Sequence, residues 1–553
     1  MRGMGKMWAW ATKKQTTVGS AAIVLALMVL MSRVLGLVRD RLLSAYFTPE
    51  ELGIYFAAFR IPNVIFELLV MGALTAAFIP VYTTLLSQDR EEAARRLATV
   101  LMNISVVVLA VAAIPIYFLA PYISSLLAPG FTQGEIAQMS TFTRFILVFQ
   151  VAPLLVGNVL TGILQSHRLF LIPAAAPVLY NIGIIIGAVF LSPLFGLWGP
   201  VIGVAIGATL FAAIQIPLVV RLGYRHSFEI NPRVAGVKEV ARLMGPRTVG
   251  LAVSQIDITI DLMLASILGA RMVTIFNFAQ HLQQLPVGLF GTTIAQAALP
   301  SLSQLSAKEN KTEFITTIRD AIHQILFWVL PASVLFVVLR IPVVRLVFGA
   351  SRFDWSATVD TSLTLSAFSI SLFAQALIHI LARGFYALHD SRTPVGVGIA
   401  TVIVNSVLSI LFILVLHLPV WSLGLSTSIA SIINALVLVY LLERKISGVI
   451  SRALLVPAVN MGLAAIATGI ALWVPLKLLD QLVFDTTRTV GLVLLTGISA
   501  GIGIVTYFFL SWVLGVTQVY AVLRITRKIG ALRGFFFEPA QEVVNGGVTD
   551  KLA

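Results

Sequence analysis

Long apolar segments recur along almost the whole chain, and they constrain its fold more than any other feature. Hydrophobic residues make up 58% of the 553 positions and charged residues only 11%. A transmembrane helix needs roughly 20 mostly apolar residues. We therefore predict an all-α polytopic membrane protein with about fourteen spans, at roughly 17–44, 50–86, 93–120, 137–164, 170–192, 197–221, 236–268, 272–303, 312–339, 357–387, 393–416, 420–443, 453–476 and 487–516.

The positive charges indicate how these spans are oriented. The net charge is +14, but Lys and Arg are scattered over short loops, so we expect no nucleic-acid partner. Loops such as 90–96 and 221–238 are rich in cations, whereas 121–135 and 193–196 have none. The alternation is a bias and not a strict rule, because the cation-poor side also holds Arg340, Arg345 and Arg352. The pattern predicts that both termini are cytoplasmic.

An internal repeat divides the chain into two similar halves. Residues 76–82 resemble residues 297–302, and Asn181 and Gly199 recur as Asn405 and Gly424. Because the repeat spans six helices, the two halves are predicted to be parallel lobes with a cleft between them. The predicted organisation is an interfacial segment at 1–16, an N-lobe at 17–221, a C-lobe at 236–443, two extra spans at 453–516, and a basic interfacial helix with a disordered tail at 517–553.

Charged residues interrupt the first span between Ser32 and Arg41. A charge at the centre of a membrane helix costs about 2.5–3.5 kcal/mol on insertion scales, so such residues usually face a cavity or a partner. Arg33, Gly36 and Asp40 share one helical face, and Arg39 is adjacent to it. One interpretation is a helix that bends at Gly36 and directs guanidinium groups at an anionic ligand. The other is a helix end among lipid headgroups.

Polar stripes occur in four further spans. A single stripe is often only a helix–helix hydrogen bond, but their number favours a shared hydrophilic cavity over structural pairing. By the repeat, Arg39 corresponds to Asp261, a carboxylate in the other lobe. The stripes are Arg60, Asn63 and Glu67; Ser254, Asp257 and Asp261; Asn277, Gln280, His281 and Gln284; and Gln375, His379 and Arg383.

The chain carries no sign of an enzyme. It has no cysteine, its membrane histidines occur one per helix, and no nucleophile–base pair or phosphate-binding loop is present. We expect no metal, no cofactor and no catalytic residues.

Short motifs along nearly all the spans resemble the MurJ (MviN) family of lipid II flippases, within the multidrug/oligosaccharidyl-lipid/polysaccharide exporter superfamily. Together they are specific, although each alone is weak. The motifs are Ser32–Gly36 with Arg39–Asp40, Ile61–Asn63, Gly72–Ala73, Ala77–Pro80, Ala128–Phe131, Met244–Pro246, Ser254–Ile256, Leu299–Ser303, and Gly384–Tyr386 followed by Asp390 and Thr393–Pro394.

The resemblance implies a multi-pass protein of the bacterial inner membrane that moves a polyprenyl-diphosphate-linked peptidoglycan precursor by alternating access. It also implies a central cationic cavity, a lipid-tail groove at spans 13 and 14, and cell-wall synthesis proteins as further partners of a monomer. The chain departs from the family pattern at Phe66 and Glu67, at His281, and at Met71. The residues predicted to bind the substrate are Arg33, Arg39, Asp40, Arg60, Asn63, Glu67, Gln280, His281 and Gln284.

Energy for transport could come from the membrane potential, at about 2.3 kcal/mol per charge per 100 mV. Asp257 and Asp261 could bind a coupling cation or form a salt bridge with an arginine of the first span. The alternative functions are a drug/cation antiporter or another lipid-linked oligosaccharide exporter of the same superfamily, and a non-transporting scaffold for cell-wall enzymes.

Overall fold

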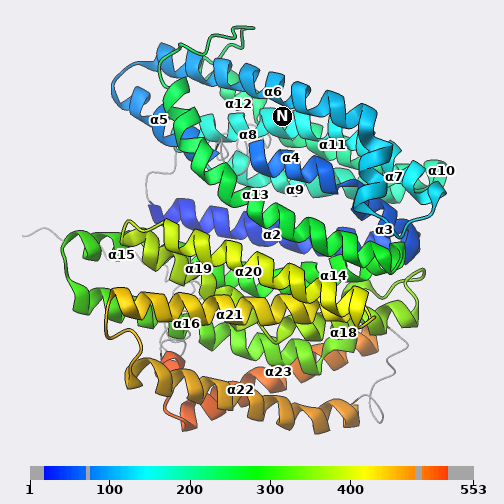
Figure 1. Cartoon of the computed structure of the whole chain (residues 1–553), viewed down its shortest axis with the longest axis vertical. Coiled ribbons are helices and arrows are strands. Elements are labelled where there is room, and N and C mark those ends of the chain that lie inside the picture. The colour runs from blue at the N-terminus through cyan, green and yellow to red at the C-terminus, as the bar shows by residue number, and fades with distance from the viewer. Residues whose placement is uncertain (1–17, 70–74, 480–488, 521–553) are drawn as a thin grey trace, which may run out of the picture.

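A computed structural model of the chain describes residues 18–69, 75–479 and 489–520, and every regular element among them is helical (Figure 1). The predicted segment 1–16, Met71 and most of the predicted basic helix and tail lie outside these residues. In chain order the helices are α2 (Val18–Tyr46), α3 (Pro49–Ala58), α4 (Arg60–Phe66), α5 (Thr75–Ser87), α6 (Glu91–Leu127), α7 (Gln133–Phe149), α8 (Val151–Ser166), α9 (Leu171–Ile186), η2 (Gly187–Leu191), α10 (Ser192–Phe195), α11 (Trp198–Ala213), α12 (Ile216–Arg221), α13 (Val237–Ile267), α14 (Ala270–Pro286), η3 (Val287–Thr292), α15 (Thr293–Ala307), α16 (Lys311–Val338), α17 (Arg340–Phe348), α18 (Trp355–Ser369), α19 (Leu372–Ala387), α20 (Arg392–Ile410), η4 (Leu411–Val415), α21 (Trp421–Lys445), α22 (Arg452–Leu478) and α23 (Thr489–Val513).

The apolar helices are long enough for a polytopic membrane protein, as predicted. Twelve helical stretches of the described residues, some of them made of consecutive helices, are long and apolar enough to cross a membrane. The pair α18 and α19, bent by 44°, would make a thirteenth. Helix α2, which carries Arg33, Arg39, Asp40 and Arg41, is not among them. The fold class is therefore confirmed, whereas the count of about fourteen is not reached by this criterion.

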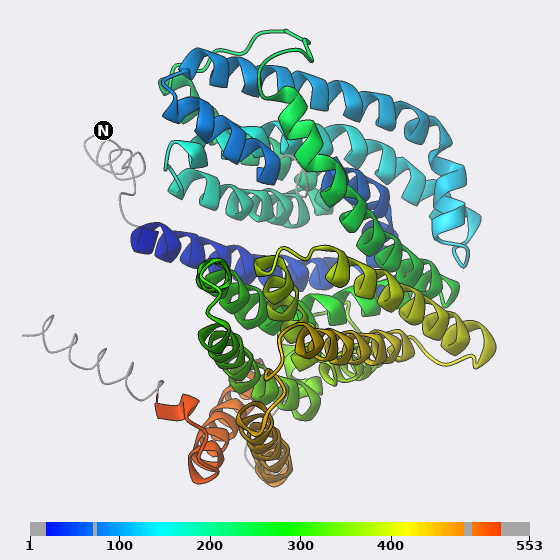
Figure 2. The ribbon, with the colours of Figure 1, turned by 60° about the vertical axis from the view of Figure 1, so that its left-hand side comes forward.

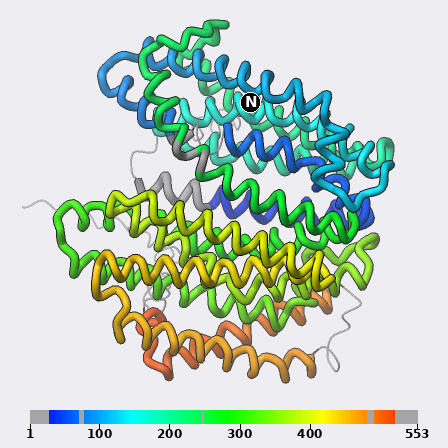
Figure 3. The backbone as a smooth tube through the Cα atoms, viewed as in Figure 1, coloured from blue at the N-terminus to red at the C-terminus, as the bar shows by residue number. Residues whose placement is uncertain are grey.

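The helices form two bundles with α2 and α13 between them (Figures 1 and 2). Helix α2 packs along α9 of the first bundle and also contacts α17 of the second. Helix α13 contacts α5 and α6 near its start and α14 and α20 further on. Helices α22 and α23 pack against each other and against α16, and they form the edge of the molecule in orange and red (Figure 3).

The internal repeat is visible in local structure as well as in sequence. The π-helical segment η2 directly follows α9, and η4 directly follows α20 at the equivalent place, 224 positions later. Asn181 in α9 accepts a hydrogen bond from Arg39 of α2, and Asn405 in α20 donates one to Asp257 of α13. Each bundle therefore joins its first helix to its fifth span through an asparagine.

Helix α2 runs as one α-helix through Gly36, so the helix assignment gives no support to the interpretation in which the first helix is interrupted there. One glycine costs a helix only about 1 kcal/mol relative to alanine. Packing along α9 holds the helix in place against so small a penalty.

The second span does break, between α3 and α4, and Pro62 explains where. Proline has no N–H, so it cannot donate to the carbonyl of Ala58 four residues earlier. Thr143 Oγ1 of α7 donates to that carbonyl instead, at 3.1 Å. The break places Arg60 at the first position of α4.

The two bundles meet backbone to backbone at one end of the molecule. A Cβ atom built on Gly53 of α3 would lie 1.8 Å from the carbonyl oxygen of Ala270, the first residue of α14. A Cβ atom on Gly130 would lie 2.1 Å from the carbonyl oxygen of Ser266. Only glycine allows these approaches. We call this region, where α3 meets α14, the closed end.

We expect Gly53→Ala to force the bundles apart at the closed end. The new methyl group would meet backbone, which cannot rotate away, and overpacking of this kind typically costs about 1–3 kcal/mol. Gly36→Ala is the matched control, because nothing lies within 4 Å of a Cβ atom there. Thermal unfolding in detergent should show a lower Tm for Gly53→Ala only. Equal Tm values for the two variants would contradict the packing argument.

Candidate functional site

A cavity of about 690 Å³ lies between the two bundles. It extends from Tyr55, near the closed end, to Gln165 in the last turn of α8 and Pro173 in the first turn of α9. Its polar and charged lining residues are Arg39, Arg60, Asn63, Glu67, Gln150, Asn158, Thr161, Gln165, Gln255, Asn277, His281 and Gln284, and its aromatic ones are Tyr55, Phe56, Phe59, Phe66, Tyr180 and Phe211. The lining thus combines amide and guanidinium groups with aromatic rings.

Six of the nine residues predicted to bind substrate line this cavity: Arg39, Arg60, Asn63, Glu67, His281 and Gln284. Asp40 lies behind the wall, almost fully buried. Gln280 is not part of the lining, and neither is Arg33, whose guanidinium lies against the backbone of Gly288 in η3. The helical spacing therefore identified most of the wall on α4 and α14.

Asp40 of α2 has two partners, its neighbour Arg39 in the same helix and His281 of α14. Arg39 donates from Nε and Nη2 to Asp40 Oδ1, at 2.9 and 2.7 Å. His281 Nδ1 of α14 lies 2.9 Å from Asp40 Oδ2. A carboxylate buried in a membrane protein needs such partners because an unpaired charge there is costly. The Arg39–Asp40–His281 triad is therefore a link between the bundles as well as part of the cavity wall.

Arg39 still has donors to offer a ligand. Its Nη1 donates to Asn181 at 3.1 Å, and its other bonds go to Asp40. A guanidinium has five N–H donors, so two remain for a planar anionic group.

Arg60 is anchored on α13. Its Nε donates to Thr259 Oγ1 at 2.8 Å, and its Nη2 donates to the carbonyl oxygen and to Oε1 of Gln255, at 2.5 and 2.7 Å. Glu67, seven residues later on the same face, also lines the cavity. Glu67 therefore offsets one of the two guanidinium charges, of Arg39 and Arg60, in the lining. The cavity is thus less cationic than the family resemblance implied.

Asp257 and Asp261 face the interior of the second bundle and not the cavity. Asn405 donates to Asp257 at 2.9 Å, and Ser409 lies 3.4 Å from Asp261. Neither carboxylate forms an ion pair with a described residue, so the predicted salt bridge to an arginine of the first span is absent. It was wrong because the polar face of α13 turns towards α20, whereas Gln255 and Ile258 face the cavity.

The remaining residue of the α13 stripe and the whole α19 stripe also lie away from the cavity. Ser254 is exposed and bonds to the carbonyl of Leu251 in its own helix. Gln375 of α19 accepts a hydrogen bond from Gln283 inside the second bundle, at 2.6 Å. His379 and Arg383 are likewise absent from the lining. The prediction that all stripes share one cavity was therefore wrong for α13 and α19.

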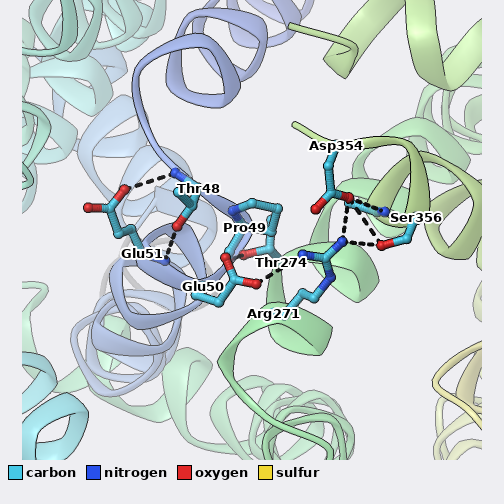
Figure 4. A network of polar contacts seen from close by, with 9 residues as sticks. Thr48, Pro49, Glu50, Glu51, Arg271, Thr274, Asp354 and Ser356 are labelled. Carbon is cyan, nitrogen blue, oxygen red and sulfur yellow. Dashed lines mark hydrogen bonds and ion pairs between the residues drawn. The ribbon is translucent and has the colours of Figure 1, made fainter. Parts of the chain in front are cut away.

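Arg271, which sequence reasoning missed, holds the closed end together (Figure 4). It donates to Glu50 Oε1 of α3 at 2.9 Å, to Asp354 Oδ1, and to Ser356 Oγ at 2.5 Å. Thr274 Oγ1, one turn later, donates to the carbonyl of Pro49 at 2.6 Å. This Arg271 network joins the two bundles where α3 meets α14, and no local pattern in the sequence marks it.

Two helix caps position the acids of this network. Thr48 and Glu51 form a capping box around Pro49 at the start of α3, which fixes Glu50 in the first turn. Asp354 caps the first turn of α18 by accepting from the amide of Ala357 at 2.7 Å. The hydrogen bond from Arg271 holds the pKa of Asp354 below its usual range.

Two helical bundles around a central polar cavity that is closed at one end define an alternating-access membrane transporter. The family model for the lipid II flippase MurJ matches residues 42–490. The chain belongs to the MurJ family. It is 29% identical over 524 residues to the probable lipid II flippase MurJ of Vibrio cholerae, covering 90% of this chain and 96% of that one.

Solved structures share the fold. A lipid II flippase MurJ in an inward closed conformation superposes with a TM-score of 0.74 at 24% identity, covering 89% of this chain and 98% of that one. An inward-facing multidrug resistance MATE family transporter of the MOP superfamily gives a TM-score of 0.62 at 17% identity, covering 77% and 98%. The predicted family is confirmed, and the likeness to these structures confirms the fold.

Proposed function

We propose that this chain moves the lipid-linked peptidoglycan precursor lipid II across the bacterial inner membrane. The observation that carries the proposal is the central cavity, in which free guanidinium donors of Arg39 lie among amide side chains beside a closed end. A diphosphate–sugar headgroup cannot cross hydrocarbon unaided, because burying its charges and hydroxyls is prohibitive. Charge-assisted hydrogen bonds in the cavity would replace its hydration.

The test is complementation in bacteria depleted of their lipid II flippase, together with precursor translocation by the purified chain in liposomes. We expect growth and translocation. A drug/cation antiporter would instead confer drug efflux without growth, and a scaffold would restore growth without translocation. Among the lining residues Glu67 is the one carboxylate, which gives an organic cation little to bind.

We propose that the carboxylates of Asp257 and Asp261 bind a coupling cation. Asn405 and Ser409 supply further oxygen atoms beside them, and oxygen ligands suit hard cations. The membrane potential would then contribute to transport through the charge that the cation carries.

Asp261→Asn should reduce translocation more than Asp261→Glu, because the amide removes the negative charge that would bind the cation. Translocation is measured across imposed cation gradients and potentials, and Ser254→Ala, on the exposed face of α13, is the control. Normal transport by Asp261→Asn under all gradients would remove the coupling role.

We propose that both termini are cytoplasmic, so that the closed end faces the outside. Ser87, the last residue of α5, and Gln133, the first of α7, are both exposed. The chain has no cysteine. An impermeant thiol reagent added to intact cells should therefore label Gln133→Cys and spare Ser87→Cys. The reverse pattern would invert the orientation.

We further propose that the chain acts as a monomer, since one chain holds both lobes. Cell-wall synthesis proteins would be its partners, because they produce and consume the precursor.

A further inference from the structure

A second cavity, of about 630 Å³, lies away from the central one, on the outer side of the second bundle. Its wall comes from the end of α16, the first turns of α17 and α18, and the facing parts of α22 and α23. It lies near the closed end, because Trp355 in its wall directly follows Asp354 of the Arg271 network. We call it the lateral pocket.

Among the residues that the structure describes, the lateral pocket is lined by three cations and by no carboxylate: Arg340, Arg345 and Lys477. None of the three forms an ion pair with any carboxylate in the described part of the chain. The guanidinium of Arg345 lies 5.6 Å from the ring centre of Trp355. Positive charges gathered beside apolar helices need an anion to offset their lost hydration.

The remainder of the wall suits an amphiphile better than a free ion. It consists of aliphatic side chains, among them the buried Leu495, together with Pro342 and the exposed Trp473. Trp473 and its neighbours on α22 present an apolar surface at the edge of the molecule. Tryptophan beside Arg and Lys is typical of the membrane–water interface, where a lipid has its phosphate.

We propose that the lateral pocket binds the phosphate headgroup of an anionic phospholipid from the leaflet at the closed end. The phosphate accepts hydrogen bonds from Arg340, Arg345 and Lys477, and the acyl chains lie along α22 and α23. This phosphate site is distinct from the place proposed for the headgroup of the transported precursor, because the lateral pocket shares no lining residue with the central cavity.

The pocket also adjoins the parts that close the molecule. Arg41 of α2 donates to the carbonyl oxygens of Arg345 and Leu346, at 3.4 and 2.6 Å. Arg41 therefore caps the last turn of α17. A lipid bound at α17 thus touches a helix that packs directly against α2, which carries the Arg39–Asp40 pair.

Native mass spectrometry of the purified full chain, in detergent with phosphatidylglycerol or phosphatidylcholine added, tests the proposal. We expect one phosphatidylglycerol to be retained in preference to phosphatidylcholine. Each Lys or Arg near a membrane surface contributes about 1 kcal/mol to anionic-lipid binding, or about fivefold. Arg340→Gln with Lys477→Gln should therefore weaken retention by about 25-fold.

Arg352→Gln is the matched control, since it removes one exposed charge from the same end without touching the pocket. Equal loss in the control and the double variant would overturn the proposal, as would equal retention of both lipids. Displacement of phosphatidylglycerol by millimolar inorganic phosphate would reassign the pocket to a free anion. An unchanged Tm in the double variant shows that the loss is not due to unfolding.

Discussion

Arg39→Ala should abolish translocation while leaving the amount of protein in the membrane unchanged. Arg39 holds Asp40 through two hydrogen bonds, reaches Asn181 with a third, and keeps two donors for the precursor. Hydrogen bonds to charged groups are typically worth about 1.5–3 kcal/mol. Losing those to a diphosphate would weaken its binding by roughly ten- to a hundredfold or more.

Arg39→Lys should retain part of the activity, because a single ammonium can still meet Asp40 but lacks the planar fork. Arg95→Ala is the control, since Arg95 forms an exposed ion pair with Glu91 on the surface of α6. The measurements are complementation with a quantitative blot, and binding of a polyprenyl-diphosphate ligand to purified protein. Full growth and unchanged affinity in Arg39→Ala would move the binding site elsewhere.

Arg271→Ala should open the closed end. Without the guanidinium, Glu50 of one bundle and the Asp354–Ser356 turn of the other lose the group that joins them. Spin labels at Gln133→Cys and Arg352→Cys, both exposed at this end, should move apart. Labels at Ser87→Cys and Lys308→Cys, exposed at the other end, should move together, as alternating access requires.

Glu50→Gln with Asp354→Asn in the Arg271→Ala background should partly restore the closed end, because the remaining carboxylates are then neutral. Acid should act through the same contact. The pKa of Asp354 is lowered, so its contribution is complete above the ordinary aspartate range and is lost as pH falls through the lowered value. Label distances that stay the same in Arg271→Ala would show that backbone packing at Gly53 closes the molecule alone.

Helical spacing correctly predicted the part of the cavity wall that the second span contributes. The helical spacing places three polar residues on one face of this span, and all three line the cavity: Arg60, Asn63 and Glu67. The same spacing in α13 marked Asp257 and Asp261 correctly as neighbours but assigned them to the wrong surroundings. Spacing tells which residues share a face, and it does not tell which helix that face will meet.

The sequence by itself determined the class of fold, the positions of most spans and the repeat. Burial in a bilayer depends on the summed hydrophobicity of about 20 consecutive residues, which is a local property that can be read along the chain. Motif composition likewise sufficed for the family.

Only the tertiary structure decided which polar groups meet. Arg271 lies 221 positions from Glu50 and 83 from Asp354, and His281 lies 241 positions from Asp40. Such partners are selected by the packing of whole bundles, because only the fold brings residues so far apart in the sequence within hydrogen-bonding distance. The closed end, the triad and the lateral pocket all arise in this way, from residues that no local pattern connects.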